Sequence, residues 1–280
     1  MEPYFPEDEY TTSAKAPRFL GTTLFGWSRW NLYFRFFRIV LRSRALAVRS
    51  AYDDEALADQ SYRIIKAVEG CGGVLHLKGL NYIRQTPGPV VFVANHMSTL
   101  ETVILPAIIT PLKSTSFVVK DSLVKGPVFG PIMRSLDPIA VTRKDPRKDL
   151  TEVLEQGARI LAKGRSLVIF PQSTRSYEFD PSRFNTLGVK LASRAQVLVI
   201  PLALKTSFWG NGLLLRGFGK LNRQDPIHFE FGPPIPITGR GKEEHRKIVD
   251  FISSRLAGWG VPVLSTPVHT SGEGLAGTTE

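Results

Sequence analysis

The chain has 280 residues, of which 42% are hydrophobic, and its mean hydropathy of −0.04 indicates a folded protein long enough to bury a core. One cysteine excludes an internal disulfide framework, and five histidines without HxxxH or HExxH spacing argue against a metal site. The formal net charge of +11 predicts an anionic partner: nucleic acid, a membrane surface or a phosphate-bearing substrate.

Residues 1–16 are polar and are expected to form a flexible N-terminus, whereas 17–69 are expected to be helical and to associate with a membrane. Two helices are predicted, over about 18–50 and about 53–69. The stretch 14–52 contains no acidic residue and interleaves arginines with aromatic side chains. This composition is typical of a helix lying in a membrane surface, with aromatics among acyl chains and arginines among anionic headgroups. A helix packed on the protein's own core, with solvated arginines, is the alternative.

The apolar segments are too short to predict a conventional spanning helix, since none reaches about 18 uninterrupted residues. No cleavable signal peptide is visible either. We therefore expect an interfacial association with the cytoplasmic face of a membrane.

Beyond residue 70 the chain alternates between apolar runs and amphipathic helical patterns. Runs such as PVVFVA, 89–94, are typical of strands buried on both faces of a parallel sheet. The fold class is therefore α/β, a mostly parallel sheet flanked by helices over 70–260, followed by a flexible tail over 261–280. Strands are predicted at 73–79, 89–94, 115–119, 138–141, 166–170 and 196–204, antiparallel edge strands at 213–219 and 227–232, and helices at 98–110, 126–135, 146–163, 184–194 and 242–258.

Four polar stretches follow predicted buried strands: NHMSTLE at 95–101, KDSLVKGP at 120–127, TRKDPR at 142–147 and PQSTRS at 171–176. Ligands of open α/β sheets bind beyond the carboxyl ends of the strands. These stretches are therefore the candidate site, and three of the four are strongly basic.

His96 and Glu101 are the candidate acid–base pair. A neutral imidazole accepts a proton near neutral pH, and a carboxylate behind it orients the ring and stabilises the imidazolium. The two side chains can meet if His96 lies in the turn before a helix and Glu101 lies in its first turn, as a capping box from Ser98 to Glu101 predicts. Alternatively, Glu101 only caps the helix and His96 is only a polar residue at a strand end. Because one carboxylate cannot fully serve both roles, we expect cap and pair to compete for it.

Arg175, within FPQSTRS, is the candidate phosphate contact. Exposed backbone N–H groups and one arginine suit a phosphate ester, although a polar turn with an incidental arginine is the alternative. Lys120 and Arg143 occupy equivalent positions after other strands. Three cations at one rim favour the phosphate interpretation.

Taken in order, N-H-x-S-x-x-(D/E), K-x-x-L-x-x-x-P-x-x-G, an apolar strand ending in Arg, F-P-x-x-T-R-S and V-I-P resemble the sequence blocks of the 1-acylglycerol-3-phosphate acyltransferase family. Here the blocks are Asn95–Glu101, Lys120–Gly130, Arg143, Phe170–Ser176 and Val199–Pro201. Their order over 95–201 is specific for the superfamily and much less specific for the substrate.

The resemblance implies transfer of a fatty acyl group from an acyl-CoA or acyl carrier protein thioester to the hydroxyl of a lysophospholipid, by default lysophosphatidic acid, at a membrane surface. His96 would be the general base and Glu101 would hold its imidazole. No metal, organic cofactor or nucleic acid is implied. The substrate-binding residues would be Asn95, Ser98, Lys120, Arg143, Gln172, Ser173, Thr174 and Arg175.

The chain departs from the family pattern in two blocks: the family has aspartate where this chain has Glu101, and Pro-Glu-Gly-Thr where this chain has PQST. Glu101 keeps a carboxylate with a longer reach. Gln172 loses a charge, and Ser173 replaces a glycine that tolerates a positive φ. A different lysolipid acceptor, or a catalytically silent lipid-binding protein on the same fold, are therefore the alternatives.

Overall fold

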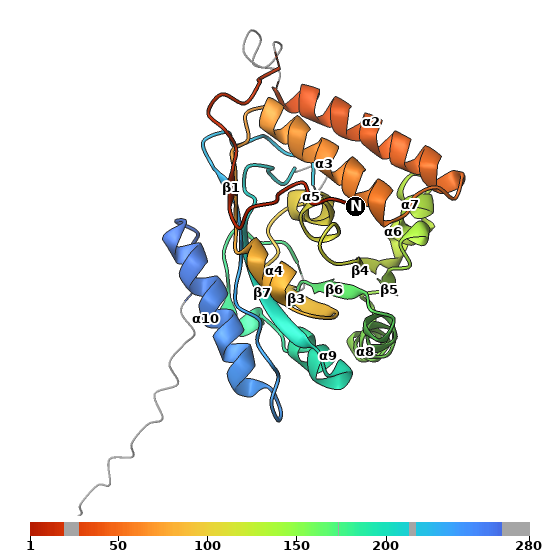
Figure 1. Cartoon of the computed structure of the whole chain (residues 1–280), viewed down its shortest axis with the longest axis vertical. Helices are drawn as coiled ribbons and strands as arrows, with labels where there is room; N and C mark the ends of the chain where they lie inside the picture. The colour runs from red at the N-terminus through yellow and green to blue at the C-terminus, as the bar shows by residue number, and fades with distance from the viewer. Residues whose placement is uncertain (20–27, 173, 213–216, 265–280) are drawn as a thin grey trace, which may run out of the picture.

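The centre of the molecule is an eight-stranded sheet with the order β1-β2-β8-β7-β3-β6-β4-β5 (Figure 1). The computed structural model describes residues 1–19, 28–172, 174–212 and 217–264. The strands are β1 Tyr10–Thr11, β2 Leu75–Lys78, β3 Val90–Ala94, β4 Thr115–Lys120, β5 Ile139–Val141, β6 Ser166–Ile169, β7 Leu198–Lys205 and β8 Ile227–Phe231.

Strand β3 lies at the middle of the parallel part of the sheet. Its five residues are all buried, as its unbroken apolar sequence predicts. Val91 pairs in parallel with Leu167 of β6 on one side and with Val199 of β7 on the other. Strands β4 and β5 continue the parallel order beyond β6. The carboxyl ends of these strands therefore meet at one edge of the sheet.

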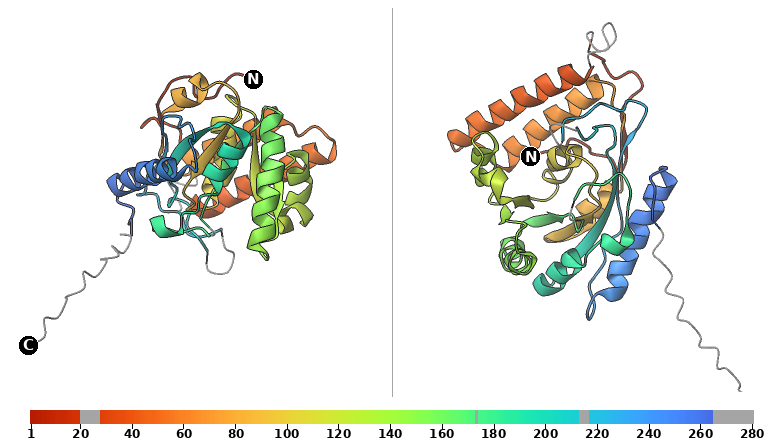
Figure 2. Two further views of the ribbon diagram at one scale, coloured as in Figure 1. Left: turned by 90° about the horizontal axis from the view of Figure 1, so that it is seen from below. Right: turned by 180° about the vertical axis from the view of Figure 1, so that it is seen from behind.

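Helices cover both faces of this sheet (Figures 1 and 2). Helices α8, α9 and α10 pack on one face against the parallel strands, while α5 covers the other face and is itself covered by α3 and α2. The helices are α2 Ser28–Val48, α3 Asp54–Gly70, α4 Leu80–Gln85, α5 Leu100–Ile109, α6 Asp121–Lys125, α7 Phe129–Ser135, α8 Pro146–Ala162, α9 Leu187–Ala195 and α10 Lys242–Gly258, with a short 3₁₀ turn at Pro181–Arg183. The α/β class and the mostly parallel sheet are confirmed.

The later strands differ from their prediction. Strand β8 is antiparallel to β7, as expected, but it is not an edge strand because β2 pairs with its other side in parallel. Of the predicted strand 213–219, residues 213–216 lie outside the described residues, and 217–219 are not a strand. The tail beyond Leu264 also lies outside the described residues.

The N-terminal segment was expected to be loose, yet residues 1–16 pack against the domain. Strand β1 pairs antiparallel with β2, and Phe5 is buried. The hydroxyls of Tyr10 and Thr12 both donate to Glu69 Oε1, at 2.6 and 2.7 Å. Thr12 Oγ1 also accepts from the backbone N–H of Leu75 at 2.9 Å. Hydrogen bonds to residues about 60 positions away in the sequence hold this polar segment in place. Such long-range contacts cannot be predicted from the local sequence pattern.

Helix α2 has one face on the protein and one face in solvent. Leu32, Tyr33, Phe36 and Val40 point inward and are buried in the same core as the sheet. The opposite side carries five apolar side chains that are 45–64% exposed, which we call the apolar stripe: Trp30, Phe34, Phe37, Leu41 and Val48. At 3.6 residues per turn these positions lie within about 60° of one another. No helix in the described part of the chain is long and apolar enough to cross a membrane.

Candidate active site

His96 and Glu101 meet where β3 gives way to α5. Helix α5 begins at Leu100, so Glu101 is in its first turn and His96 lies in the preceding loop. His96 Nδ1 lies 2.8 Å from Glu101 Oε1. An ionised carboxylate only accepts hydrogen bonds, so the Nδ1 atom carries the proton and Nε2 is left with its lone pair. Among the described residues, none forms a hydrogen bond with Nε2.

The Glu101 carboxylate is fully buried, and several donors surround it. Besides the imidazole, Oε1 accepts from the backbone N–H groups of Met97 and Ser98 at 2.7 and 2.8 Å. Its second oxygen, Oε2, accepts from Ser98 Oγ at 3.0 Å and from Thr206 Oγ1 at 2.6 Å. The two oxygens thus serve the helix N-terminus and the imidazole together, and the expected competition between cap and pair is wrong. We call Ser98, Glu101 and Thr206 the carboxylate cage.

The cage keeps Glu101 ionised. Burial by itself raises the pKa of this carboxyl, but the hydrogen bond and the charge of His96, followed by the Thr206 hydroxyl, outweigh it and the pKa is lowered. The result is a fixed negative charge behind the imidazole. That charge stabilises the imidazolium which forms when Nε2 takes up a proton.

Thr206 is the member of the cage that the sequence did not reveal. It directly follows β7, is fully buried, and its backbone N–H donates to Met97 Sδ at 3.3 Å. The only sequence signal was its place after a buried strand, the same signal that singled out the four polar stretches. The Ser98 hydroxyl, which donates to Glu101, also lies 2.9 Å from Thr206 Oγ1 and accepts from the Leu100 N–H at 3.0 Å, so Ser98 contacts both other parts of the cage and the helix N-terminus.

Gln172 anchors the loop that carries His96. Its side-chain oxygen Oε1 accepts from the backbone N–H of His96 at 2.6 Å, while the His96 carbonyl accepts from the Ser176 N–H at 3.0 Å. The imidazole stacks on Phe170, with 4.5 Å between ring centroids. The contact requires only an acceptor oxygen, which glutamine and glutamate both offer. Glutamine in place of the family's glutamate at position 172 therefore still allows the hydrogen bond to the His96 N–H.

Asn95 acts between strands. Its side-chain amide donates to the Leu204 carbonyl at 2.8 Å, and its Oδ1 accepts from the Leu204 N–H at 2.9 Å. These two bonds join the end of β3 to β7 and so position the loop that follows. Asn95 and Ser98 were expected to contact the substrate. In the structure both are buried and form hydrogen bonds with other residues of the protein.

Three basic residues lie at or after the ends of β4, β5 and β6: Lys120 is the last residue of β4, and Arg143 and Arg175 follow β5 and β6. We call these three residues the cation rim. Lys120 is exposed and pairs through its backbone with Val141, two residues before Arg143. Arg143 is also exposed and has a positive φ of 59°. Arg175 is half-buried. Burial lowers the pKa of its guanidinium, the charge of Glu101 raises it and the charge of Arg143 lowers it again. On balance the pKa is lowered, and Glu101 and Arg143 are both close enough to influence it.

The remaining predicted residues of this loop are Ser173 and Thr174. Thr174 is exposed beside Arg175, and Ser173 lies outside the described residues. Gly217, with φ +111°, packs against the loop: a β-carbon there would lie 3.3 Å from Arg175 Nη1 and 2.6 Å from Thr99 Oγ1. In the described ranges no group of three His, Cys, Asp or Glu side chains is arranged to hold a metal ion.

Comparison with known proteins bears on this arrangement. Residues 74–205, which contain both the pair and the cation rim, match the family model described as Acyltransferase. This part of the chain is therefore similar to acyltransferases. The matched region includes every strand from β2 to β7 and therefore the whole strand-end edge on which the site is built.

Similar proteins carry more specific names. A 1-acyl-sn-glycerol-3-phosphate acyltransferase of Pseudomonas aeruginosa is 35% identical over 166 residues, which cover 59% of this chain and 60% of that protein. A chloroplast 1-acyl-sn-glycerol-3-phosphate acyltransferase of Arabidopsis thaliana is 27% identical over 159 residues, or 55% of this chain and 44% of that protein. The chain thus matches about half of the length of these curated relatives.

Among solved structures, the crystal structure of the 1-acyl-sn-glycerophosphate acyltransferase PlsC from Thermotoga maritima superposes with a TM-score of 0.63. The match covers 83% of this chain and 93% of that one at 18% sequence identity. At this identity the likeness establishes the fold. It extends well beyond the region that matches the family model, into the helices that surround the sheet.

Proposed function

We propose that the protein transfers a fatty acyl group from a thioester to the free hydroxyl of a lysophospholipid, with lysophosphatidic acid as the acceptor and phosphatidic acid as the product. The observation that carries this proposal is the 2.8 Å contact between His96 Nδ1 and the buried Glu101 carboxylate. This contact fixes the tautomer of the imidazole, so that Nε2 is free to accept a proton. Nε2 lies at the edge of the sheet where α/β proteins bind ligands. The names of the relatives support the choice of acceptor.

In the proposed reaction His96 Nε2 takes the proton of the acceptor hydroxyl as its oxygen attacks the thioester carbonyl carbon. The tetrahedral intermediate collapses with cleavage of the carbon–sulfur bond, and the leaving thiolate takes up the proton from the imidazolium. The products are an ester and a free thiol, so no covalent acyl-enzyme, metal or organic cofactor is required. Glu101 stays ionised throughout and balances the transient charge on His96.

The cation rim would bind the phosphate of the acceptor. Arg175 is the central member, because it lies within electrostatic reach of both Glu101 and Arg143. A guanidinium can hold a phosphate by two parallel hydrogen bonds, which would fix the distance between the phosphate and the hydroxyl that reacts. Lys120 and Arg143 would add longer-range attraction from the neighbouring strand ends.

The apolar stripe of α2 would hold the enzyme on the cytoplasmic face of a membrane. Its five exposed apolar side chains are flanked along the helix by the exposed Arg38, Arg42 and Arg49. Apolar side chains beside arginines match the boundary between acyl chains and anionic headgroups. An interfacial position would bring the site to the surface where lysolipid acceptors reside.

An assay matrix of donors and acceptors tests the function. Purified protein in mixed micelles is offered acyl-CoA and acyl carrier protein thioesters, each with lysophosphatidic acid, lysophosphatidylcholine, lysophosphatidylglycerol or no acceptor. We expect thiol release and a new diacyl lipid with lysophosphatidic acid. Turnover with a different lysolipid alone would move the acceptor assignment, and no turnover with any pair would contradict the proposed activity.

A further inference from the structure

A cavity of about 840 Å³ lies beside the acid–base pair, and its wall includes Met97, the residue after His96, and Tyr177, two residues after Arg175. The sheet order sets this arrangement. His96 follows β3, and the rim residues lie at or after the ends of β6, β4 and β5, on one side of β3. On the other side of β3 is β7, which ends at the cavity residue Lys205 and is followed by the cavity residue Ser207. The base therefore has a rim of cations near it and, one residue away at Met97, the wall of an open cavity large enough for a ligand.

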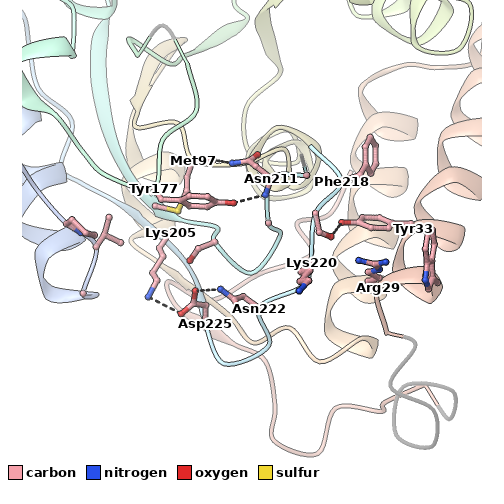
Figure 3. Close-up of a pocket in the computed structure, with 18 of the residues that line it drawn as sticks. Arg29, Tyr33, Met97, Tyr177, Lys205, Asn211, Phe218, Lys220, Asn222 and Asp225 are labelled. Atoms are coloured by element: carbon pink, nitrogen blue, oxygen red, sulfur yellow. Dashed lines mark hydrogen bonds and ion pairs between the residues drawn. The ribbon is translucent and has the colours of Figure 1, made fainter. Parts of the chain in front are cut away.

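The wall nearest to α2 is aromatic. Tyr33 and Phe37 pack against Phe218 with ring centroids 5.3 and 5.5 Å apart, and Trp30 lines the same region. Toward Met97 the wall is polar. The hydroxyl of Tyr177 accepts from the backbone N–H of Asn211 at 2.6 Å (Figure 3). The Ser207 hydroxyl, in the same wall, has no hydrogen-bond partner among the described residues. One part of the wall is thus aromatic, and the other offers the unpaired Ser207 hydroxyl and the amide of Asn211. Such a wall suits a ligand in which apolar segments alternate with amide groups.

Two cations without an acidic partner in the described chain stand on this wall. Arg29 and Lys220 are both exposed, and the Arg29 guanidinium lies 4.9 Å over the Trp30 ring. The hydrogen bond from Tyr33, one turn beyond Arg29, to the carbonyl of Gly219, next to Lys220, brings the two to the same part of the cavity. The third cation, Lys205, is already engaged by Asp225, 3.8 Å away. Arg29 and Lys220 are therefore the groups available to a ligand phosphate.

We propose that this cavity binds the phosphopantetheine arm of the acyl donor, with Arg29 and Lys220 on its phosphate and the polar wall beside Met97 on its amides. The inference rests on the proposed function and adds the donor site. A thioester bound here approaches the acid–base pair from the β7 side, while the acceptor phosphate lies on the rim at the β6 side. Coenzyme A and an acyl carrier protein share this arm, so the shared chemistry defines the site and the two sources are separated by experiment.

The first test compares the KM for the acyl donor with the KM for the acceptor. Lys220→Ala, and Arg29→Ala with Lys220→Ala, are expected to raise the KM for hexadecanoyl-CoA about 10- to 100-fold, the effect of losing charge-assisted hydrogen bonds. The KM for lysophosphatidic acid should stay within about twofold. Lys190→Ala with Arg194→Ala removes the same charge from the exposed side of α9 and should change neither constant. A rise in the lysophosphatidic acid KM instead would place the acceptor in the cavity and overturn the proposal.

The second test removes the phosphate from the donor. Wild-type protein should use hexadecanoyl-pantetheine with a higher KM than hexadecanoyl-phosphopantetheine, and the double variant should no longer distinguish them. Unequal constants in the double variant would mean that other residues read the phosphate. Running the same variants with a hexadecanoyl carrier protein shows whether that source also depends on Lys220. Because Arg29 belongs to α2, sedimentation with vesicles of phosphatidylcholine and phosphatidylglycerol checks that membrane binding is unchanged.

A binding measurement keeps this inference separate from the proposed activity. His96→Ala protein should bind coenzyme A in a calorimeter, and the additional change Lys220→Ala should weaken that binding about tenfold or more. Such a dependence would support the donor site even if the acceptor proved to be another molecule. If the wild type acylates lysophosphatidic acid but Lys220→Ala does not change coenzyme A binding, the proposed activity stands and the proposed donor site is refuted.

Discussion

The carboxylate cage and the cation rim lie at the same edge of one sheet, but their side chains are satisfied to very different degrees. Glu101 is fully buried and accepts from three side chains and two backbone N–H groups. In the rim, Lys120 is exposed and its side chain has no hydrogen bond or ion pair with a described residue, while Arg175 is half-buried. A closed set of hydrogen bonds fixes the geometry of a base in advance, whereas exposed cations retain their capacity for an incoming phosphate.

The comparison predicts that the two regions fail in different ways. Changes in the cage should lower kcat, because the base is misplaced or loses its counter-charge while the phosphate is still bound. Changes in the rim should raise the KM for the acceptor.

Glu101→Gln should cost the most among the cage changes. The amide keeps the length and can still accept from the Ser98 N–H, but it removes the negative charge behind the imidazole. We expect kcat to fall about 10²- to 10³-fold, within the range of general-base effects, with little change in the acceptor KM. Steady-state kinetics in mixed micelles measure both constants. A loss smaller than about threefold would contradict the role of the cage.

The same variant also tests the lowered pKa of Glu101. A carboxyl whose native pKa lies below its unfolded value stabilises the fold above the unfolded value of about 4.3 and loses that contribution as pH falls through the native value. The unfolding free energy of the wild type should therefore decrease below about pH 4.3 more steeply than that of Glu101→Gln. Urea titrations from pH 3 to pH 7 compare the two proteins. Parallel curves would refute the shift.

Arg175→Ala should produce the largest effect in the rim. Charge-assisted hydrogen bonds contribute about 1.5–3 kcal/mol, so the lysophosphatidic acid KM should rise about 10- to 100-fold with kcat less affected. Arg175→Lys should recover only part of this, since lysine cannot bind a phosphate through a planar fork. Monoacylglycerol, which has no phosphate, serves as the control acceptor and should not distinguish the variants. Equal effects on both acceptors would place Arg175 outside the phosphate site.

Gln172 separates geometry from charge. Gln172→Glu retains an acceptor oxygen for the His96 N–H and should keep kcat within about threefold. Gln172→Leu leaves that N–H unpaired, at a cost of about 1–3 kcal/mol, and should lower kcat about tenfold. Lower activity in the glutamate variant than in the leucine variant would show that the neutral side chain itself matters.

Thr206→Val and Thr174→Ala form the mildest pair. Valine matches threonine in shape but leaves Glu101 Oε2 with one donor fewer, so we expect a loss of about 1–2 kcal/mol in unfolding free energy and a several-fold lower kcat. Thr174 is exposed on the rim side, and its replacement should change stability by less than about 0.5 kcal/mol. Urea unfolding and steady-state kinetics measure these effects. Equal losses of unfolding free energy and of kcat in the two variants would contradict the proposed difference between the cage and the rim.

Local sequence patterns predicted much of the fold. The apolar run at β3 and the amphipathic pattern of α10 each correspond to the observed element, because burial on two faces or on one face dictates which residues can follow one another. The meeting of His96 and Glu101 was also predictable from local sequence, because Glu101 lies only five positions after His96 and the start of a helix between them fixes their geometry.

What escaped prediction depends on distant contacts. Thr206 is 105 residues from Glu101, and nothing around it marks it as a hydrogen-bond donor to a buried carboxylate. The anchoring of Tyr10 and Thr12 on Glu69 spans 57 to 59 residues in the same way. Gln172 was interpreted as a lost charge near the acceptor, whereas its contact is with the His96 backbone. Such roles emerge only when the chain is folded.

The most direct test of the central claim is the rate of thiol release from hexadecanoyl-CoA in the presence of lysophosphatidic acid by wild type and His96→Ala. The account predicts a loss of about 10²- to 10⁴-fold or more in kcat for the variant, the contribution of a positioned general base. Vesicle sedimentation and coenzyme A binding should be unchanged. Full activity in His96→Ala would show that Nε2 is not the base and would contradict the mechanism.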